Sequence, residues 1–375
     1  MTKKNLIIIM IDGGRLDRAQ TSSVFNNLKS KSIFFSNSIT YGPHTIAAMH
    51  AVFSGSYGSR TGTNSYWSTY KFKKNKFKTL TEYLKEENYI TYADVINQLV
   101  VPKQGFENYI VHDELNDDLV ERHKNLLDEM HKKNLENKNF FVYLHYSKIH
   151  TGIMNEVLKV YDNFSEEFFS NKEKNTERYD KLFKTSTEYL NEILDRIRQL
   201  KLDKNSIILI MSDHGISTGE KIGERAYGAF CYDYTLKTIT HFLIPNFEPI
   251  EIKQQIRTID FMPTILELLD IPFDTKYSPM DGTSLVPLIR GKSLSEQYAF
   301  SETGNPLHEK TPPKEPNVKS IRNSKWKLIF NEHNCSKELY NLELDPHENK
   351  NLINTNQEIS DILWVELKKL MNKSN

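Results

Sequence analysis

The sequence predicts an α/β fold in which a mixed, mostly parallel sheet is flanked by helices, with a small antiparallel sheet near the C-terminus. Two uninterrupted apolar runs, residues 6–11 and 207–211, are too short to cross a membrane and are typical of strands buried on both faces. Helical and strand patterns alternate along most of the chain, as in layered α/β domains. After residue 290 short strands prevail. We therefore predict a large domain over residues 1–290 and a small α+β subdomain over residues 291–375.

Hydrophobic periodicity and chain breakers predict the individual elements. In the first half, strands are expected at residues 6–11, 89–95 and 139–150, and helices at residues 46–53, 79–87, 113–137 and 179–200. In the second half, one strand runs from residue 206 to Asp213, another covers residues 241–245, and a helix covers residues 258–270. The small subdomain is expected to contain short strands at residues 301–302, 321–330 and 338–340, and a helix at residues 358–371.

Composition limits the classes of function. The 375 residues include 49 basic and 49 acidic side chains, so the total charge indicates no affinity for nucleic acid. Two cysteines, Cys231 and Cys335, are too few for a disulfide framework and are consistent with a reducing compartment. The apolar run near the N-terminus lacks a small-residue cleavage site. We expect a cytoplasmic protein with no membrane span.

Thr45 lies where a helix is predicted to begin. Gly42 and Pro43 break the chain, and residues 46–53 are good helix formers at amphipathic spacing. Backbone N–H groups at a helix N-terminus favour an anion, so a hydroxyl there would meet an anionic ester. The simpler alternative is that Thr45 only caps the helix.

Two predicted strands end in groups that bind metals. Asp12 follows the first strand and precedes two glycines, while Asp213 and His214 end the strand that begins at residue 206. Ligands bind at the carboxyl ends of strands in open α/β sheets, and two carboxylates with one imidazole suit a divalent ion. The alternatives are that the aspartates cap helices and that His214 is a buried structural residue.

Further polar residues are candidates for the same site. His150 lies in the loop that ends the strand predicted at residues 139–150, and it could protonate a leaving group. His44, Lys148 and Lys221 are candidate substrate-binding residues that would neutralise anionic oxygens, although surface ion pairs would also explain the lysines. The basic and aromatic run at residues 70–78 could contact an anionic glycan, or it could be a solvated loop.

With these residues in place, the chain resembles the sulfatase family of the alkaline phosphatase superfamily over nearly its whole length. The matching motifs occur in the family's order: residues 11–17 for the first metal loop, 45–62 for the nucleophile helix, 140–150 for a strand ending in a substrate histidine, 212–215 for the second metal loop, and later matches at 260–266, 281–288, 326–329, 338–342 and 345–348. The resemblance implies an alkaline-phosphatase-like fold, with residues 1–290 as the catalytic domain.

Two departures from the family's pattern determine the predicted reaction. Sulfatases carry a cysteine or serine followed by Pro, Ser and Arg, which is oxidised to formylglycine, and this chain has Thr45 at that position followed by Ile46. The usual second acid of the first metal loop is Gly13 here. Threonine nucleophiles occur in the superfamily's phosphodiesterases, phosphatases and transferases. The resemblance therefore predicts a metal-dependent hydrolase or transferase of phosphate esters, of phosphodiester or phosphonate type, with Thr45 as nucleophile.

One divalent ion, Mn, Mg, Ca or Zn, is expected as cofactor, bound by Asp12, Asp213, His214 and the Thr45 oxygen. No Asp-x-x-x-His or Asp-x-x-Gly-His spacing occurs between Thr45 and Asp213, which predicts one metal site rather than two. The predicted substrate is a small anionic ester or glycan precursor, and the oligomeric state stays open. Two alternatives remain: a sulfuric ester hydrolase that uses unmodified Thr45, and a catalytically inactive family member that binds an anionic glycan.

Overall fold

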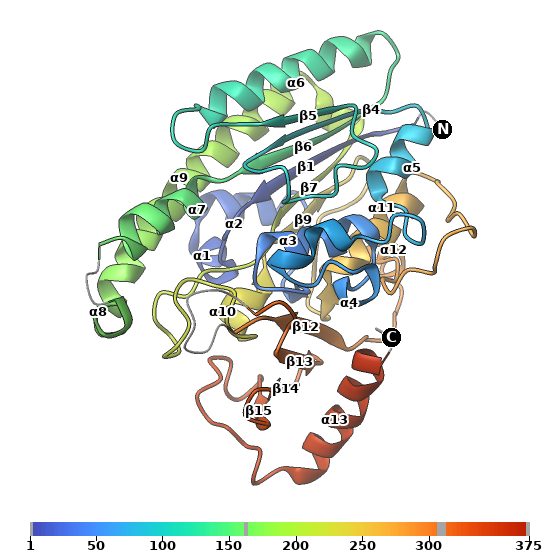
Figure 1. Cartoon of the computed structure of the whole chain (residues 1–375). Helices are drawn as coiled ribbons and strands as arrows, with labels where there is room; N and C mark the ends of the chain where they lie inside the picture. The colour runs from blue at the N-terminus through green and yellow to red at the C-terminus, as the bar shows by residue number, and fades with distance from the viewer. Residues whose placement is uncertain (1–2, 161–163, 306–312, 373–375) are drawn as a thin grey trace.

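The computed structural model describes residues 3–160, 164–305 and 313–372. Among these residues, eight strands form a central sheet in the order β10-β2-β9-β7-β1-β6-β4-β5 (Figure 1). β1 (Asn5–Ile11) lies between β7 (Ser206–Ser212) and β6 (Phe140–Tyr146) and runs parallel to both. The other strands of this sheet are β2 (Ile33–Phe35), β4 (Ile90–Val95), β5 (Asn108–Val111), β9 (Thr240–Leu243) and β10 (Ile250–Ile252). Only β9 pairs antiparallel with its two neighbours, β2 and β7, among the described strands of this sheet, which confirms the predicted mostly parallel sheet.

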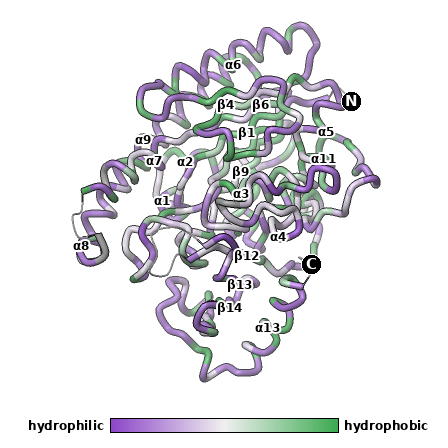
Figure 2. Tube along the Cα trace, in the orientation of Figure 1, coloured by the Kyte–Doolittle hydropathy of each residue, from purple (hydrophilic) through white to green (hydrophobic). Residues whose placement is uncertain are grey.

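Helices cover both faces of the central sheet. Leu6, Ile8 and Met10 of β1 pack on the face covered by α3 (Thr45–Ser54), α5 (Leu80–Glu86) and α11 (Phe261–Leu268). The alternate residues Ile7, Ile9 and Ile11 pack on the face covered by α2 (Ser23–Lys29), α6 (Leu119–Leu135) and α9 (Lys172–Gln199). Figure 2 accordingly shows hydrophobic residues in the central strands and mostly hydrophilic residues along α6. Because β1 is buried on both faces, its residues from Leu6 to Ile11 are all apolar.

The C-terminal part forms the predicted small antiparallel sheet and final helix. Its strands are β12 (Ala299–Thr303), β13 (Val318–Arg322), β14 (Trp326–Asn331) and β15 (Ser336–Asn341), and α13 (Gln357–Asn372) follows. The single strand expected at residues 321–330 is wrong: the Asn323 side chain accepts hydrogen bonds from the backbone N–H groups of Lys325 and Trp326, at 2.9 and 2.7 Å, and makes a turn between β13 and β14. The division at residue 290 stays a prediction.

Short elements complete the described structure. A three-stranded sheet is formed by β3 (Ser38–Ile39), β8 (Lys237–Thr238) and β11 (Ile256–Arg257). The short helices are α1 (Leu16–Thr21), α4 (Gly58–Thr61), α7 (Lys148–Gly152), α8 (Phe164–Ser170), α10 (Asp233–Leu236) and α12 (Val286–Ile289). The 3-10 helices are η1 (Tyr66–Lys71), η3 (Leu202–Lys204) and η4 (Thr258–Asp260), and η2 (Ile153–Leu158) is a π-helix. Within the described ranges, every helix is too short or too polar to pass through a membrane.

Candidate active site

Asp12, Asp213 and His214 come together at the carboxyl ends of two neighbouring strands. β1 and β7 are parallel and paired so that Ile11 lies beside Ser212, which places the residues that follow them side by side. One potential ligand atom from each of the three side chains lies within 4.8 Å of the others, and all three side chains are buried. We call this group the Asp12 cluster. The structure thus gathers the three predicted metal ligands, although metal binding by them stays a prediction.

The free acceptor atoms of the Asp12 cluster suit a cation. Asp213 Oδ1 accepts hydrogen bonds from the backbone N–H groups of Gly13 and His214, at 3.1 and 2.9 Å. His214 Nδ1 lies 2.8 Å from the Gly215 carbonyl, so Nδ1 carries the proton and Nε2 is left as an acceptor. Asp12 Oδ1 and Asp213 Oδ2 are buried and have no hydrogen-bond partner within the described part of the chain. Two such oxygens and one imidazole nitrogen are a ligand set for a divalent ion.

Electrostatics of the protein alone also favour a cation here. Burial raises the pKa of the Asp213 carboxyl, the His214 ring opposes this, and the neighbouring Asp12 carboxylate adds to the increase. Two adjacent carboxylates are costly to bury in the ionised form. A divalent ion between them would remove that cost.

The alternative roles as helix caps do not apply to the two aspartates. Arg15, not Asp12, is the N-cap of α1, and the next helix after Asp213 within residues 164–305 is α10, which has Tyr232 as its N-cap. Gly13 takes a positive φ of +73°, and a Cβ atom built there would lie 3.0 Å from the Ile216 side chain. The position of the family's second acid therefore has no room for a side chain unless Ile216 moves.

Thr45 is the first residue of α3 and faces the Asp12 cluster. Its Oγ1 lies 3.4 Å from Asp12 Oδ2 and 3.5 Å from His214 Nε2. The N-cap of α3 is His44, whose Nδ1 accepts a hydrogen bond of 3.4 Å from the Ala47 N–H group. The capping alternative for Thr45 is thereby excluded. Burial lowers the pKa of His44 to about 3, so this ring is neutral and can bind an anion only by hydrogen bonding.

Two histidines flank Asp12. His150 Nδ1 lies 3.8 Å from Asp12 Oδ1 and 3.2 Å from the Tyr227 hydroxyl, and the His150 side chain is 26% exposed. His145 Nε2 lies 3.1 Å from Asp12 Oδ2, and His145 is fully buried in β6. Sequence reasoning chose His150 and missed His145. The sequence feature that could have identified His145 is a histidine within a strand whose other residues are apolar or aromatic.

The two candidate lysines bind other parts of the chain. Lys148 Nζ donates a hydrogen bond of 2.9 Å to the Glu114 carbonyl. Lys221 Nζ donates to the Glu348 carbonyl and lies over the Tyr232 ring at 4.9 Å. Their substrate-binding roles, like that of His44, stay predictions.

Family models and curated proteins identify relatives of this chain. A model described as Sulfatase matches residues 4–271, and one described as N-sulphoglucosamine sulphohydrolase, C-terminal, matches residues 229–374. A choline-sulfatase from Rhizobium meliloti is 25% identical over 193 residues, which cover 48% of this chain and 34% of the relative. A delta 4,5-hexuronate-2-O-sulfatase from Bacteroides thetaiotaomicron is 25% identical over 175 residues, covering 45% and 35%. The chain thus spans about a third of the length of these curated relatives.

Solved structures match the whole fold. A 2-O GAG sulfatase superposes with a TM-score of 0.78 at 19% identity, covering 99% of this chain and 92% of that one. A structure in complex with its substrate D-glucosamine-2-N,6-O-disulfate gives a TM-score of 0.77 at 15% identity, covering 99% and 98%. At this level of identity the likeness establishes the fold alone.

These comparisons correct the predicted reaction. The main prediction, a phosphate-ester hydrolase or phosphotransferase, is wrong, because the relatives and structural neighbours are sulfatases. The prediction relied on departures from the family's pattern, chiefly Thr45 in place of the family's usual residue, whereas the family model matches residues 4–271. The chain belongs to the sulfatase family.

Proposed function

We propose that this protein is a sulfuric ester hydrolase that uses unmodified Thr45 and acts on a sulfated saccharide. The observation that carries the proposal is the position of the Thr45 hydroxyl, at the start of α3 and 3.4 Å from Asp12 in the Asp12 cluster. Sulfated saccharides are favoured as substrates because the structural neighbours include a 2-O GAG sulfatase and a protein bound to a disulfated glucosamine. The cytoplasmic location stays a prediction.

Asp12, Asp213 and His214 would hold the divalent ion that sulfatase family members bind. Such an ion supplies positive charge that offsets the sulfate oxygens and favours ionisation of a neighbouring hydroxyl. Its identity among Mn, Mg, Ca and Zn is part of the proposal's test.

Thr45 is the proposed nucleophile. Its proton passes to Asp12 Oδ2, the carboxylate oxygen that lies 3.4 Å away. Thr45 Oγ1 then forms a bond to sulfur while the bond from sulfur to the ester oxygen breaks, which leaves a sulfated threonine. The partial positive charge at the N-terminus of α3 would offset the developing negative charge.

His150 is the proposed acid and base, because its side chain is partly exposed next to Asp12. As an acid it protonates the departing alcohol oxygen, and as a base it takes a proton from the water that attacks sulfur in the second step. That attack breaks the bond from sulfur to Thr45, and the Thr45 oxygen recovers its proton from Asp12. The products are an alcohol and hydrogen sulfate.

A hydrolysis screen tests the proposal. The purified protein, with each of the four divalent ions, is assayed on an aryl sulfate, choline sulfate, 2-O- and 6-O-sulfated glucosamine saccharides and an aryl phosphodiester. Turnover of a sulfated saccharide that is lost in Thr45→Ala and partly retained in Thr45→Ser supports it. Equal sulfate turnover by Thr45→Ala, or turnover of the phosphodiester alone, would refute it.

A further inference from the structure

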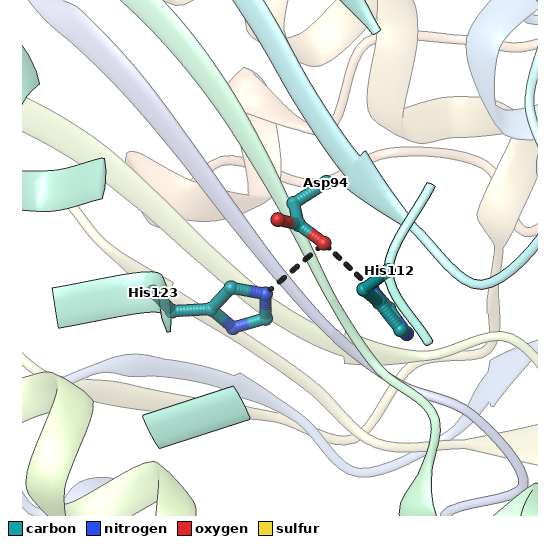
Figure 3. A group of neighbouring side chains, drawn as sticks. All are labelled: Asp94, His112 and His123. Carbon is teal, nitrogen blue, oxygen red and sulfur yellow. Dashed lines mark hydrogen bonds and ion pairs between the residues drawn. The ribbon is translucent and has the colours of Figure 1, made fainter. Parts of the chain in front are cut away.

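A second buried group of carboxylate and imidazole side chains lies beside the proposed active site. It consists of Asp94 in β4, His112 directly after β5, and His123 in α6, and we call it the Asp94 cluster (Figure 3). None of the three residues is more than 3% exposed. One potential ligand atom from each lies within 4.8 Å of the others. The central sheet and α6 therefore bring together three metal-binding groups that the sequence analysis did not connect.

Both imidazole rings direct a nitrogen toward one carboxylate oxygen. Asp94 Oδ1 lies 2.6 Å from His112 Nδ1 and 3.7 Å from His123 Nε2, and both contacts are visible in Figure 3. The second distance is too long for a hydrogen bond. His123 Nε2 is buried and has no hydrogen-bond partner among the residues that the structure describes. A buried nitrogen without a hydrogen bond lowers the stability of the fold, so a simple hydrogen-bonded network does not explain the position of His123.

Other contacts fix the orientation of the three side chains. His112 Nε2 lies 2.9 Å from the Ser147 hydroxyl, and His123 Nδ1 lies 2.6 Å from the Tyr189 hydroxyl. Metal-binding histidines are commonly held in this way through the nitrogen that faces away from the ion. Arg122 Nε lies 2.5 Å from Asp94 Oδ2, which leaves Oδ1 to face the histidines. The Arg122 charge is itself offset by Asp117, at 3.3 Å.

We propose that Asp94, His112 and His123 form a second metal site, and that it takes Zn²⁺. One carboxylate oxygen and two imidazole nitrogens suit this ion, which binds such ligands at about 2.0–2.2 Å. Ligands at these lengths stand roughly 3.3 Å apart in a tetrahedron, and the separations of 2.6 and 3.7 Å lie on either side of that value. Small rotations of the side chains would therefore form the site. The ion would join the carboxyl ends of β4 and β5 to α6.

This proposal is independent of the reaction assigned to Thr45. It also revises the sequence-based expectation of one metal site, because that expectation relied on short spacings between ligands. The His112 ring lies 6.2 Å from the His145 ring, which in turn contacts Asp12, so the two clusters are neighbours. A test must therefore distinguish metal bound at the Asp94 cluster from metal bound at the Asp12 cluster.

Anomalous diffraction from crystals of the wild-type protein grown with excess zinc provides this test. We expect an anomalous peak at the zinc edge between Asp94, His112 and His123. A peak at the Asp12 cluster alone, or at neither cluster, would overturn the proposal, and either outcome leaves the hydrolysis screen free to decide the proposed function.

A matched pair of variants extends the test to solution. His123→Gln removes one proposed ligand, whereas His131→Gln changes a half-buried histidine on the same helix outside the cluster. After dialysis against zinc, His123→Gln should hold one zinc per chain fewer than the wild type, and His131→Gln should hold the same number. Equal zinc content in all three proteins would contradict the proposal. If His123→Gln does not fold, the wild-type crystals still decide.

Discussion

The Asp12 cluster and the Asp94 cluster contain similar residue types in a similar place, but their surroundings differ. Both are buried, and both lie at the carboxyl ends of parallel strands of one sheet. The Asp12 cluster faces the Thr45 hydroxyl and the partly exposed His150. In the Asp94 cluster, the Ser147 and Tyr189 hydroxyls each bond the far nitrogen of a histidine. Carboxylates and imidazoles can hold an ion in either place, but a catalytic site also needs a nucleophile beside the ion and access for substrate.

Strand order explains how the two clusters can be so close. β6 is the strand between β1 and β4, and it carries His145, which contacts Asp12. Ser147, two residues later, contacts His112 of the Asp94 cluster. One strand end thus supports both clusters, and variants can test whether their roles are separate.

The largest expected effect is that of Thr45→Ala on catalysis. Removing the hydroxyl should lower turnover of the sulfate ester at least about a thousandfold, because no other group replaces the nucleophile. Metal content should stay unchanged, because Asp12, Asp213 and His214 remain. Steady-state kinetics and elemental analysis of the same preparation check both points. Activity within tenfold of the wild type would show that Thr45 is not the nucleophile.

The second prediction concerns Asp213→Asn, which removes one charged ligand of the Asp12 cluster. We expect loss of one divalent ion per chain and of nearly all activity, because Asp213 Oδ2 is one of two carboxylate oxygens in this cluster with no hydrogen-bond partner among the described residues. Zinc at the Asp94 cluster should be retained. Elemental analysis and anomalous diffraction measure the two sites separately, and loss of metal from both would mean that the clusters are coupled.

Another buried carboxylate, Glu302, shows how burial changes the pKa of a carboxyl group outside the two clusters. Glu302 in β12 accepts a hydrogen bond from Tyr41, and burial raises the pKa of Glu302 to about 7, above its ordinary value of 4.5. A raised pKa favours the folded state below pH 4.5, and this contribution is lost as the pH rises to about 7. The wild type should therefore lose up to about 3 kcal/mol of its free energy of unfolding between pH 5 and pH 8, and Glu302→Gln should not lose it. Denaturant unfolding at the two pH values measures this, and parallel pH profiles of both proteins would contradict it.

The smallest predicted effect is that of His145→Gln. His145 Nε2 lies 3.1 Å from Asp12 Oδ2, so the variant should misplace Asp12 and weaken metal binding about tenfold. The control variant is His112→Gln, which alters the Asp94 cluster and should leave metal affinity at the Asp12 cluster unchanged. Metal titration of activity compares the two variants. Equal weakening by both would show that the clusters do not act separately.

Local sequence was sufficient for the main elements and for the candidate residues at strand ends and at the start of α3. The apolar run of residues 6–11 required a buried strand, and the break at Gly42 and Pro43 required a helix to start near Thr45. Asp12 and Asp213 could be predicted because each ends such a strand, and parallel strands end at one edge. Residues 323–325 were misread as strand, because the turn depends on the single side chain of Asn323.

Sequence alone did not distinguish sulfate from phosphate. Both esters are tetrahedral and anionic, so a cluster of potential metal ligands with a threonine at a helix start suits either, and the choice of phosphate depended on the identity of Thr45. The comparisons overturned the phosphate prediction, because the Sulfatase model matches residues 4–271.

The sequence by itself determined which residues end the buried strands and where the helix that starts at Thr45 begins, because hydrophobic pattern and chain breakers act over a few residues. Only the tertiary structure decided which distant side chains meet. His145 reaches Asp12, and His112 and His123 reach Asp94, because β1, β6, β4 and β5 are neighbours in the sheet and α6 packs against it. Strand order depends on packing across the whole domain, and no short stretch of sequence contains it.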